Sequence, residues 1–500
     1  MDQAPAPRAR LDAGLVQGFW RGEVAVFLGI PFAQAPVGQL RFDAPAPARP
    51  WAGVRLACEY GPTPNRVPVT DGLMPETIVP GDATLNLNVF SPARGRFLNP
   101  APAETGLPVM VWFHGGGYIA GSPKNEWYEA PSFTRDGVIV VTVSYRLGFD
   151  GFGLIEGAPT NRAVRDWLAA LTWVRDNIAA FGGDPGRVTI AGQSAGGGVV
   201  LTLLGMERAE GLFRAAISLS GVIEDVSPER ARREADRLAR LAGVAADRAG
   251  FASLDEDRLR DLQPGGPGTP VLDRIRAVKA MMGGQLPVGP LIDGDLIERP
   301  TRDSLAQGVN AAKPLLICTL DQEMTTEWGR WMPKPLALVP KTALLKRIGL
   351  DQAAARIYAA EHREMTTRQL IGQVGGDLVF RRPALAVAEL RGANTWLARM
   401  PWRSGSFGDS RHCVDVPFFF DILDWPSAQV WTGPDAPPEI ADALHGAALA
   451  LIRGENPAWE AWTAERGATL VLDAPVRVER NGYGDVRCLK ADSRMGKSWT

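Results

Sequence analysis

Residues 192–196 read Gly-Gln-Ser-Ala-Gly and lie between two segments of different character. The preceding segment Arg187–Ala191 (RVTIA) is rich in β-branched residues, which predicts a strand. The following segment, Ala195–Leu204, predicts a helix. A strand that turns at once into a helix needs glycine on both sides of the turn, because larger side chains would clash there. The pattern therefore predicts a sharp strand–turn–helix unit with Ser194 exposed at the edge of a sheet.

The segments around this unit alternate between strand and helix patterns. Between residues 161 and 181, apolar side chains recur at intervals of three and four, which predicts one face of a long helix. Strand–helix alternation predicts an α/β fold with a parallel sheet covered on both faces. We expect a turn at Asp184–Gly186 and further strands at Pro108–Phe113, Gly137–Tyr145, Phe213–Leu219 and Lys313–Ile317.

The segment Pro228–Leu262 has a different, highly charged helical pattern and is expected to lie outside the sheet. Ser253 and Glu256 have the spacing of a capping box, which predicts that a helix begins at Ser253. We find no internal repeat and no composition that suggests a linker. The prediction is a single domain, 1–500, with a helical insertion around 225–380.

Composition excludes several classes of function. The net charge is −2 over 500 residues, so the composition does not indicate the basic surface that binding to nucleic acids or anionic membranes requires. No apolar run is long enough to span a bilayer, and the first residues lack the apolar core of a signal peptide. The four cysteines have neither metal-ligand nor disulfide-framework spacing. We expect a protein without metal or cofactor that is cytoplasmic, although an exported protein whose leader has been removed would have the same sequence features.

Residues 114–118 read His-Gly-Gly-Gly-Tyr and follow the predicted strand that ends at Phe113. Acyl transfer builds negative charge on a carbonyl oxygen, and each backbone N–H aimed at that oxygen contributes about 3 kcal/mol. Glycines let the backbone approach that closely. Together with the turn at residues 192–196, this loop predicts a serine hydrolase. Its nucleophile is Ser194, and its oxyanion hole is formed by the N–H groups of Gly116, Gly117 and Ala195.

The chain has four histidines, so the general base is selected by elimination. His114 belongs to the glycine loop. His362 lies among charged residues and is expected to be solvated, whereas His445 lies in a helix rich in alanine and leucine and is expected to be packed. His412 is in a turn that leads into an apolar segment, late in the chain. That position fits the order nucleophile, acid, base of α/β-hydrolases, so His412 is the predicted base.

The acid of the triad must lie between the nucleophile and the base, in a loop after a strand. The segment Lys313–Met324 has this character and contains two carboxylates, Asp321 and Glu323. The residues alone favour neither.

Several longer motifs resemble the type-B carboxylesterases, the group that includes bacterial para-nitrobenzyl esterases, animal carboxylesterases and cholinesterases. The resemblance runs from about Gly18 to about Pro457. The matching motifs are Phe27–Ala33 (FLGIPFA), Pro36–Phe42 (PVGQLRF), Leu87–Val89 (LNV), Val111–Tyr118 (VWFHGGGY), Ser144–Gly148 (SYRLG), Asn177–Pro185 (NIAAFGGDP), Ser220–Gly221 (SG) and His412–Phe418 (HCVDVPF).

The resemblance implies a large, mostly parallel sheet flanked by helices, with a small N-terminal β-sheet and helical insertions. It also implies that Glu323 is the acid, that Ser220 places a hydroxyl near the acid–base pair, and that the protein is a monomer or homodimer. The sequence departs from the family at Gln193, where Glu is frequent. It also departs in the stretch Gly81–Leu85, which lacks the family's cysteine, and in the acid loop, where Cys318, Leu320 and Gln322 replace Gly, Asn and Asp.

The departures bear on the substrate, a small-molecule ester. No Trp lies between Gly61 and Asn86, where cholinesterase-like members hold a cationic group by a cation–π contact. Gln193 removes a carboxylate beside the nucleophile, so neutral esters are expected. Trp328 and Trp331 are candidates for the pocket wall or for the core.

Three other functions are alternatives to neutral ester hydrolysis. Arg330 and Lys334 suit a polycarboxylate ester of the mycotoxin type. Amidase activity would use the same triad. A non-catalytic adhesion relative would lack the nucleophile, which this chain has.

Overall fold

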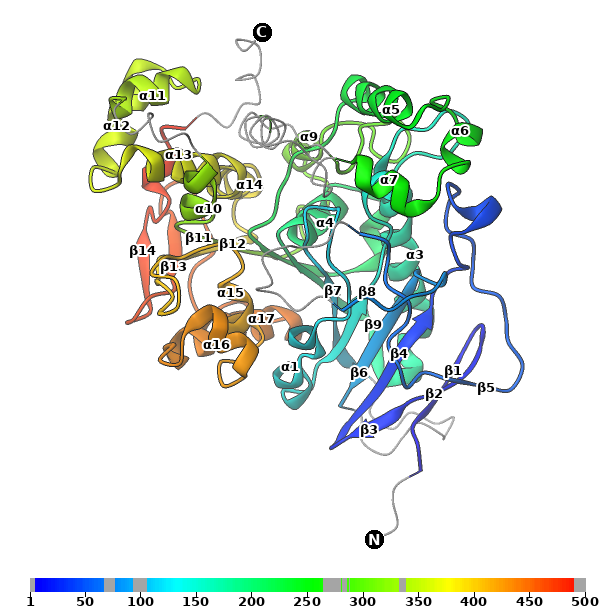
Figure 1. Ribbon diagram of the computed structural model, residues 1–500. Helices are drawn as coiled ribbons and strands as arrows, with labels where there is room; N and C mark the ends of the chain where they lie inside the picture. The colour runs from blue at the N-terminus through cyan, green and yellow to red at the C-terminus, as the bar shows by residue number, and fades with distance from the viewer. Residues whose placement is uncertain are drawn as a thin grey trace.

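The computed structural model describes residues 5–66, 77–92, 106–263, 280, 286, 288–331 and 339–489. Over these residues, an eleven-stranded sheet forms the centre of the molecule, in the order β14-β13-β12-β11-β10-β9-β7-β8-β6-β4-β3 (Figure 1). The strands are β3 (Phe19–Arg21), β4 (Val24–Pro31), β6 (Asn86–Ser91), β7 (Leu107–Phe113), β8 (Ile139–Val143), β9 (Gly183–Gln193), β10 (Ala215–Leu219), β11 (Leu315–Leu320), β12 (Thr395–Met400), β13 (Ala468–Val471) and β14 (Arg477–Arg480).

The strands from β13 through β8 in this order run parallel, and antiparallel strands flank them at both edges. A small separate sheet contains β1 (Arg8–Leu11), β2 (Gly14–Gln17) and β5 (Val54–Leu56). The predicted fold class is therefore confirmed: a large, mostly parallel sheet with a small N-terminal sheet beside it.

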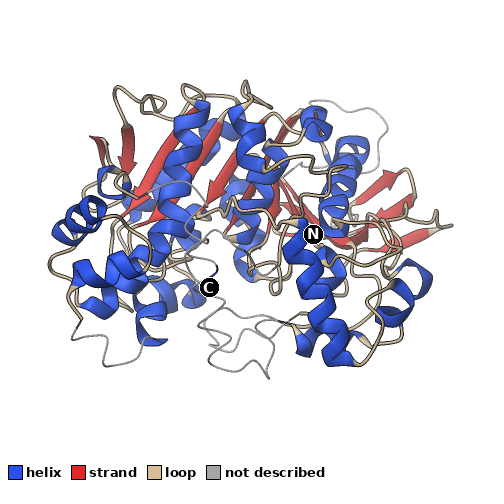
Figure 2. Ribbon diagram, turned by 90° about the horizontal axis from the view of Figure 1, so that it is seen from above, coloured by secondary structure: helices blue, strands red, loops and turns tan. Residues whose placement is uncertain are grey.

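Helices lie on both sides of the large sheet (Figure 2). They are α1 (Pro131–Arg135), α2 (Gly148–Phe152), α3 (Arg162–Asn177), α4 (Ala195–Leu204), α5 (Pro228–Ala242), α6 (Arg248–Ala252), α7 (Glu256–Leu262), α9 (Thr301–Ala306), α10 (Thr325–Trp331), α11 (Lys341–Arg347), α12 (Gln352–Glu361), α13 (Thr367–Gly376), α14 (Arg382–Arg391), α15 (Asp415–Phe419), α16 (Pro426–Thr432) and α17 (Pro438–Arg453). Shorter helical turns are η1 (Gly38–Leu40), η2 (Glu126–Glu129), η3 (Ile178–Phe181), η4 (Glu207–Leu212), η6 (Asp377–Arg381) and η7 (Gly484–Val486).

Side-chain alternation along the strands divides the core into two layers. On β7, Val109, Val111 and Phe113 pack in one apolar cluster with residues of α3 and α4. Met110 and Trp112 point to the other face and pack in a second cluster with residues of α15 and α17. Because both faces of β7 are buried, its sequence is a continuous apolar run rather than an alternation of apolar and polar residues.

Three local predictions differ from the structure. The expected turn at Asp184–Gly186 is part of β9, where the four residues between Gly183 and Val188 oppose a single residue of β7 and form a bulge. The carboxylate of Asp184 still accepts a bond from the Gly186 N–H, so the turn chemistry is present inside the strand. The predicted capping box is wrong: α7 begins at Glu256 with Asp255 as its N-cap, and Ser253 is the C-cap of α6.

The third difference concerns the predicted helix between residues 161 and 181, whose last turn is the separate 3₁₀ segment η3. Of the helices in the described ranges, none is long and apolar enough to cross a membrane.

Candidate active site

Ser194 lies in the sharp turn between β9 and α4. Its backbone has φ 58° and ψ −122°, a combination that residues other than glycine rarely adopt. The Ser194 N–H donates to the carbonyl of Leu219 on β10 across 2.8 Å, which holds the strained turn in place. A Cβ atom on Gly196 would lie 2.0 Å from the Phe113 carbonyl oxygen, so only glycine lets α4 begin this close to β7.

The glycine loop after β7 lies against the same turn. Gly116 and Gly117 have φ values of 113° and 61°, which glycine adopts without strain. A Cβ on Gly115 would lie 3.2 Å from the Ser194 Cβ, so the loop passes directly beside the serine. Across the described part of the chain, the N–H groups of Gly116, Gly117 and Ala195 donate to no protein acceptor.

His114, the first residue of the glycine loop, contacts the loop backbone and Tyr145. Its Nδ1 lies 2.8 Å from the Gly115 carbonyl oxygen, and its ring stacks on Tyr145 with 4.4 Å between ring centres. The Tyr145 hydroxyl donates to the His114 carbonyl across 2.8 Å. Complete burial lowers the pKa of His114 to about 4, so the ring is neutral at neutral pH. The contacts of His114 are thus with the glycine loop and with Tyr145 beside it.

Glu323 and His412 form a direct pair. Glu323 follows β11, is 2% exposed, and its Oε2 lies 2.6 Å from His412 Nδ1. Its other oxygen accepts bonds from the Ser220 hydroxyl at 2.7 Å and from the Leu320 N–H at 3.0 Å. The His412 N–H also donates to the Glu323 carbonyl across 3.0 Å. The carboxylate is thus fully engaged and the imidazole orientation is fixed.

The charge of Glu323 determines the protonation of this histidine. Burial alone would lower the pKa of His412, but the hydrogen bond and negative charge of Glu323 outweigh it and raise that pKa. His412 is therefore a stronger base than a free imidazole.

The structure brings Ser194 to the same edge of the sheet as this pair, but it does not join them by a hydrogen bond. In the described structure, His412 Nε2 has the side-chain amide of Gln193 as its neighbour, at 3.2 Å, rather than Ser194 Oγ. β9, β10 and β11 are adjacent parallel strands, and Gln193, Ser220 and Glu323 each stand at or just beyond their carboxyl ends.

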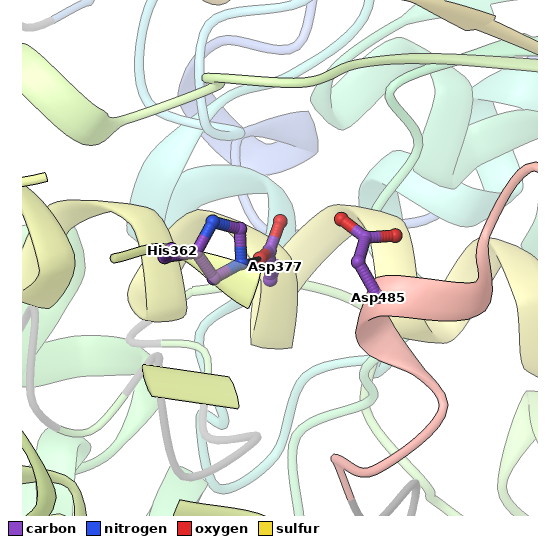
Figure 3. A group of neighbouring side chains, drawn as sticks. All are labelled: His362, Asp377 and Asp485. Carbon is purple, nitrogen blue, oxygen red and sulfur yellow. Dashed lines mark ion pairs between the residues drawn. The ribbon is translucent and has the colours of Figure 1, made fainter. Parts of the chain in front are cut away.

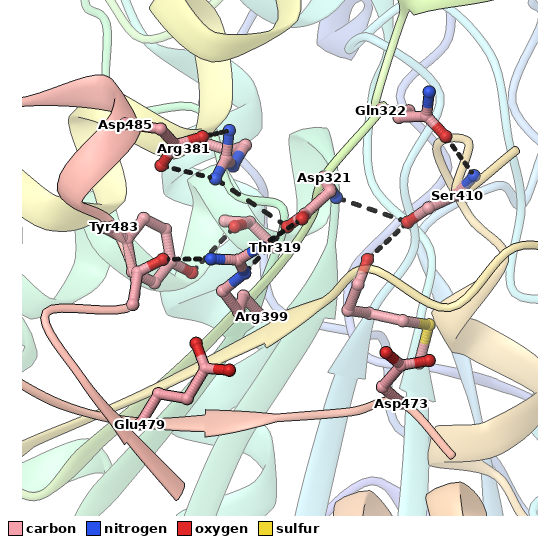
Figure 4. Close-up of polar contacts among 12 residues, drawn as sticks. Thr319, Asp321, Gln322, Arg381, Arg399, Ser410, Asp473, Glu479, Tyr483 and Asp485 are labelled. Carbon is pink, nitrogen blue, oxygen red and sulfur yellow. Dashed lines mark hydrogen bonds and ion pairs between the residues drawn. The ribbon is translucent and has the colours of Figure 1, made fainter. Parts of the chain in front are cut away.

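Asp321, the other carboxylate of the acid loop, lies in an ion network with Arg399 and Arg381 (Figure 4). Its oxygens lie 3.1 and 2.5 Å from the Arg399 guanidinium, and Arg381 lies 3.7 Å away. Arg381 also makes a two-pronged pair with Asp485 at 2.7 and 3.0 Å. The two carboxylates therefore lie in different environments: Glu323 contacts His412, whereas Asp321 contacts arginines. The sequence alone did not distinguish them.

The remaining candidates have mixed outcomes. Trp328 is 4% exposed and lies in the buried core cluster. The side chain of Trp331, that of Arg330 and the whole of Lys334 lie outside the described residues. His445 is packed as expected: its ring bonds to the Phe419 carbonyl and to Asp136.

The expectation that His362 is solvated is wrong. Its side chain is 10% exposed, and its ring lies against Tyr358 with 4.3 Å between ring centres. Together with Asp377 and Asp485 it forms a group whose ligand-type atoms lie within 4.8 Å of one another (Figure 3). However, Arg381 is ion-paired to both carboxylates, so its guanidinium already offsets part of their negative charge.

Two residues that lie near His412, namely Asp415 and Cys413, were not singled out from the sequence. Asp415, in the first turn of α15, is fully buried, and burial together with the charge of Glu323 raises its pKa to about 7. Cys413 accepts a bond from the Gln193 amide across 3.2 Å. For Asp415, the sequence signal was its place between Val414 and Val416 at the start of an apolar segment. A carboxylate in such a segment is rarely buried unless another group pairs with it.

The chain is similar to known proteins in both sequence and structure. The family model described as "Carboxylesterase family" matches residues 5–436. The chain is 30% identical to para-nitrobenzyl esterase of Bacillus subtilis over 498 residues, covering 95% of this chain and 96% of that protein. It is 33% identical to fumonisin B1 esterase of Sphingopyxis macrogoltabida over 440 residues, covering 82% and 74%.

Among solved structures, a carboxylesterase of Geobacillus stearothermophilus superimposes with a TM-score of 0.81 at 30% identity, covering 96% of this chain and 99% of that one. A structure titled PNB esterase gives a TM-score of 0.77 at 29% identity, covering 97% and 99%. With the matched family model and the shared architecture, the chain belongs to the carboxylesterase family and is a carboxylic ester hydrolase with the α/β-hydrolase fold.

Proposed function

We propose that this protein is a serine esterase that hydrolyses neutral carboxylic esters through an acyl-enzyme. Ser194 is the nucleophile, His412 the general base and acid, and Glu323 the carboxylate that orients the imidazole. The observation that carries this proposal is the Glu323–His412 pair beside the strained turn at Ser194. That arrangement combines an activated base with a serine held at a helix N-terminus.

In the first half-reaction, Ser194 Oγ attacks the ester carbonyl carbon and its proton moves to His412 Nε2. To receive this proton, Nε2 must exchange its contact with Gln193 for one with Ser194 Oγ. Negative charge then develops on the former carbonyl oxygen, where the unpaired N–H groups of Gly116, Gly117 and Ala195 would stabilise it. The imidazolium gives its proton to the departing alcohol oxygen, which leaves an ester between the acyl group and Ser194.

In the second half-reaction, water attacks the acyl carbon and gives its proton to the same Nε2. The proton then returns to Ser194 Oγ as the carboxylic acid leaves. Glu323 keeps its charge throughout and stabilises the imidazolium in both halves. No metal or cofactor takes part in these steps.

A fluorophosphonate probe followed by peptide mass spectrometry tests the assignment of the nucleophile. We expect a single adduct on Ser194, and we expect Ser194→Ala to lose about 10⁴-fold or more in kcat, because only the oxyanion hole and binding then remain. Ser253→Ala, at an exposed position between α6 and α7, is the matched control and should retain wild-type turnover. Near-wild-type esterase activity in a folded Ser194→Ala protein would overturn the proposal.

A second candidate is hydrolysis of a polycarboxylate ester of the mycotoxin type. The similarity to fumonisin B1 esterase favours it. Measuring kcat/KM for two esters with the same alcohol, one with a neutral and one with a polyanionic acyl group, separates the candidates. A preference for the polyanionic ester selects the second.

A further inference from the structure

The side chain of Gln193 occupies an unusual position between the catalytic elements. It is 1% exposed, and it ends β9 immediately before Ser194. Its Nε2 lies 3.2 Å from His412 Nε2 and 3.2 Å from Cys413 Sγ. A single amide group therefore contacts both the proton-transferring nitrogen and the neighbouring thiol.

The bond on the far side of the imidazole defines what this amide does. His412 Nδ1 faces the Glu323 carboxylate at 2.6 Å, so Nδ1 carries the hydrogen in the neutral ring. Nε2 then holds a lone pair, and the amide N–H of Gln193 can donate to it. In this state the amide holds the neutral ring in place between turnovers, and the Ser194 hydroxyl must replace the amide at Nε2 before proton transfer.

The reaction also passes through the imidazolium, in which Nε2 carries a hydrogen. Rotating the Gln193 amide by about 180° presents its oxygen to that N–H, because the two ends of an amide are nearly the same size. The Cys413 thiol suits both orientations, since sulfur accepts weakly and S–H donates weakly. A carboxylate at position 193 would accept from the protonated ring and would offer no donor to the neutral one.

The other groups that face the imidazole are mostly acidic. Glu323 follows β11, Asp415 begins α15 and Glu327 lies on α10, and each of these charges favours the protonated ring. The Phe380 ring covers the imidazole with 4.7 Å between ring centres. On the Nε2 side, the neighbour at hydrogen-bond distance is the neutral amide of Gln193.

We propose that Gln193 is a positioning residue that serves both protonation states of His412, with the Cys413 thiol as the partner that accepts either orientation of the amide. Its neutrality keeps the imidazole deprotonated, and hence active, to a lower pH than a carboxylate at this position would allow. The inference rests on the proposed function, in which His412 is the base.

The test is the pH dependence of kcat/KM, whose acid limb reports the pKa of the base in the free enzyme. Gln193→Glu should raise that pKa by about one unit or more, because an opposite charge beside the imidazolium stabilises it. Activity would then be lost at a higher pH on acidification, by about tenfold for each unit below the new pKa. Exposed Gln307→Glu makes the same chemical change on the surface and should leave the acid limb in place.

Gln193→Met separates the charge effect from the loss of the amide, and it remains informative if Gln193→Glu does not fold. Methionine supports neither state, so we expect the acid-limb pKa not to rise and kcat to fall by about tenfold, while KM changes little. Cys413→Ser, which keeps a donor and an acceptor, should stay closer to wild type than Cys413→Ala in both kcat and acid-limb pKa.

The outcomes distinguish this inference from the proposed function. If Gln193→Glu and Gln193→Met both keep the wild-type acid limb and kcat while Ser194→Ala and His412→Ala abolish turnover, the role of Gln193 is wrong and the esterase mechanism stands. If His412→Ala keeps full activity, the mechanism itself is wrong.

Discussion

The hydroxyl of Ser220 donates to Glu323 Oε1 across 2.7 Å, while the other oxygen of the same carboxylate faces His412. Ser220 lies just after β10 with φ 45°, so a strained residue delivers this hydroxyl. The contact fixes the carboxylate from the side opposite to the imidazole. The hydroxyl of Ser220, which the family resemblance placed near Glu323 and His412, is thus in direct contact with Glu323.

Ser220→Ala should therefore weaken catalysis without abolishing it. A hydrogen bond to a charged group contributes about 1.5–3 kcal/mol, and we expect part of this to appear as a loss of about tenfold in kcat with little change in KM. Ser218→Ala is the matched control, because that buried hydroxyl on the same strand bonds to the Gly197 carbonyl instead. Equal losses in the two variants would indicate a general packing effect.

Glu323 and Asp321 should respond differently to loss of charge. Glu323→Gln removes the charge that stabilises the imidazolium and should lower kcat by about 10³-fold or more. Asp321→Asn should be mild by comparison, because that carboxylate pairs with Arg399 and Arg381 and does not touch the imidazole. Steady-state kinetics on both variants gives the ranking, and the reverse order would show that Asp321 is the acid.

The enzyme should prefer neutral alcohol groups to cationic ones of similar size. At an effective dielectric constant near 20, two unit charges about 5 Å apart interact by about 3 kcal/mol. Gln193 lacks the carboxylate that would supply this attraction beside Ser194, so a cation preference of about two decades in kcat/KM should be missing. With the acyl chain held constant, a neopentyl-type ester should exceed the choline ester, and Gln193→Glu should shift the ratio toward choline. A wild-type preference for choline would reveal a cation site elsewhere.

Activity should be independent of divalent metal ions. The group of His362, Asp377 and Asp485 has the spacing for a metal, but the guanidinium of Arg381 is already ion-paired to both of its carboxylates. Dialysis against EDTA should leave kcat/KM unchanged when measured against a buffer-dialysed sample. Activity that disappears with EDTA and returns with a divalent ion would contradict the proposed mechanism.

The strand–turn–helix unit around Ser194 could be predicted from sequence because its geometry is local. β-branched residues form β9, and glycines at 192 and 196 fit only a tight junction. The positions of His412 and Glu323 depended on chain order and family resemblance, since the contact between them spans 89 residues.

The burial of His362 and Asp415 could not be predicted, because both are buried by segments distant in sequence. His362 follows α12, and its surroundings include Asp485 near the C-terminal end of the described chain. Charged neighbours in sequence suggested a solvated surface, but Asp377 and Arg381 engage one another in the interior. Ion networks of this kind leave no periodic pattern.

The ion network behind the acid loop has a consequence for how activity arises during synthesis. Arg399, which holds Asp321, also donates to the Gly482 carbonyl, and the Tyr483 hydroxyl bonds to Thr319 and to the Ala398 carbonyl. The loop that carries Glu323 is thus supported by residues translated some 160 positions after it. A nascent chain that has completed Ser194, Glu323 and His412 still lacks this support. The protein should therefore become an efficient catalyst only once β14 and the turn that leads to η7 have been made and docked.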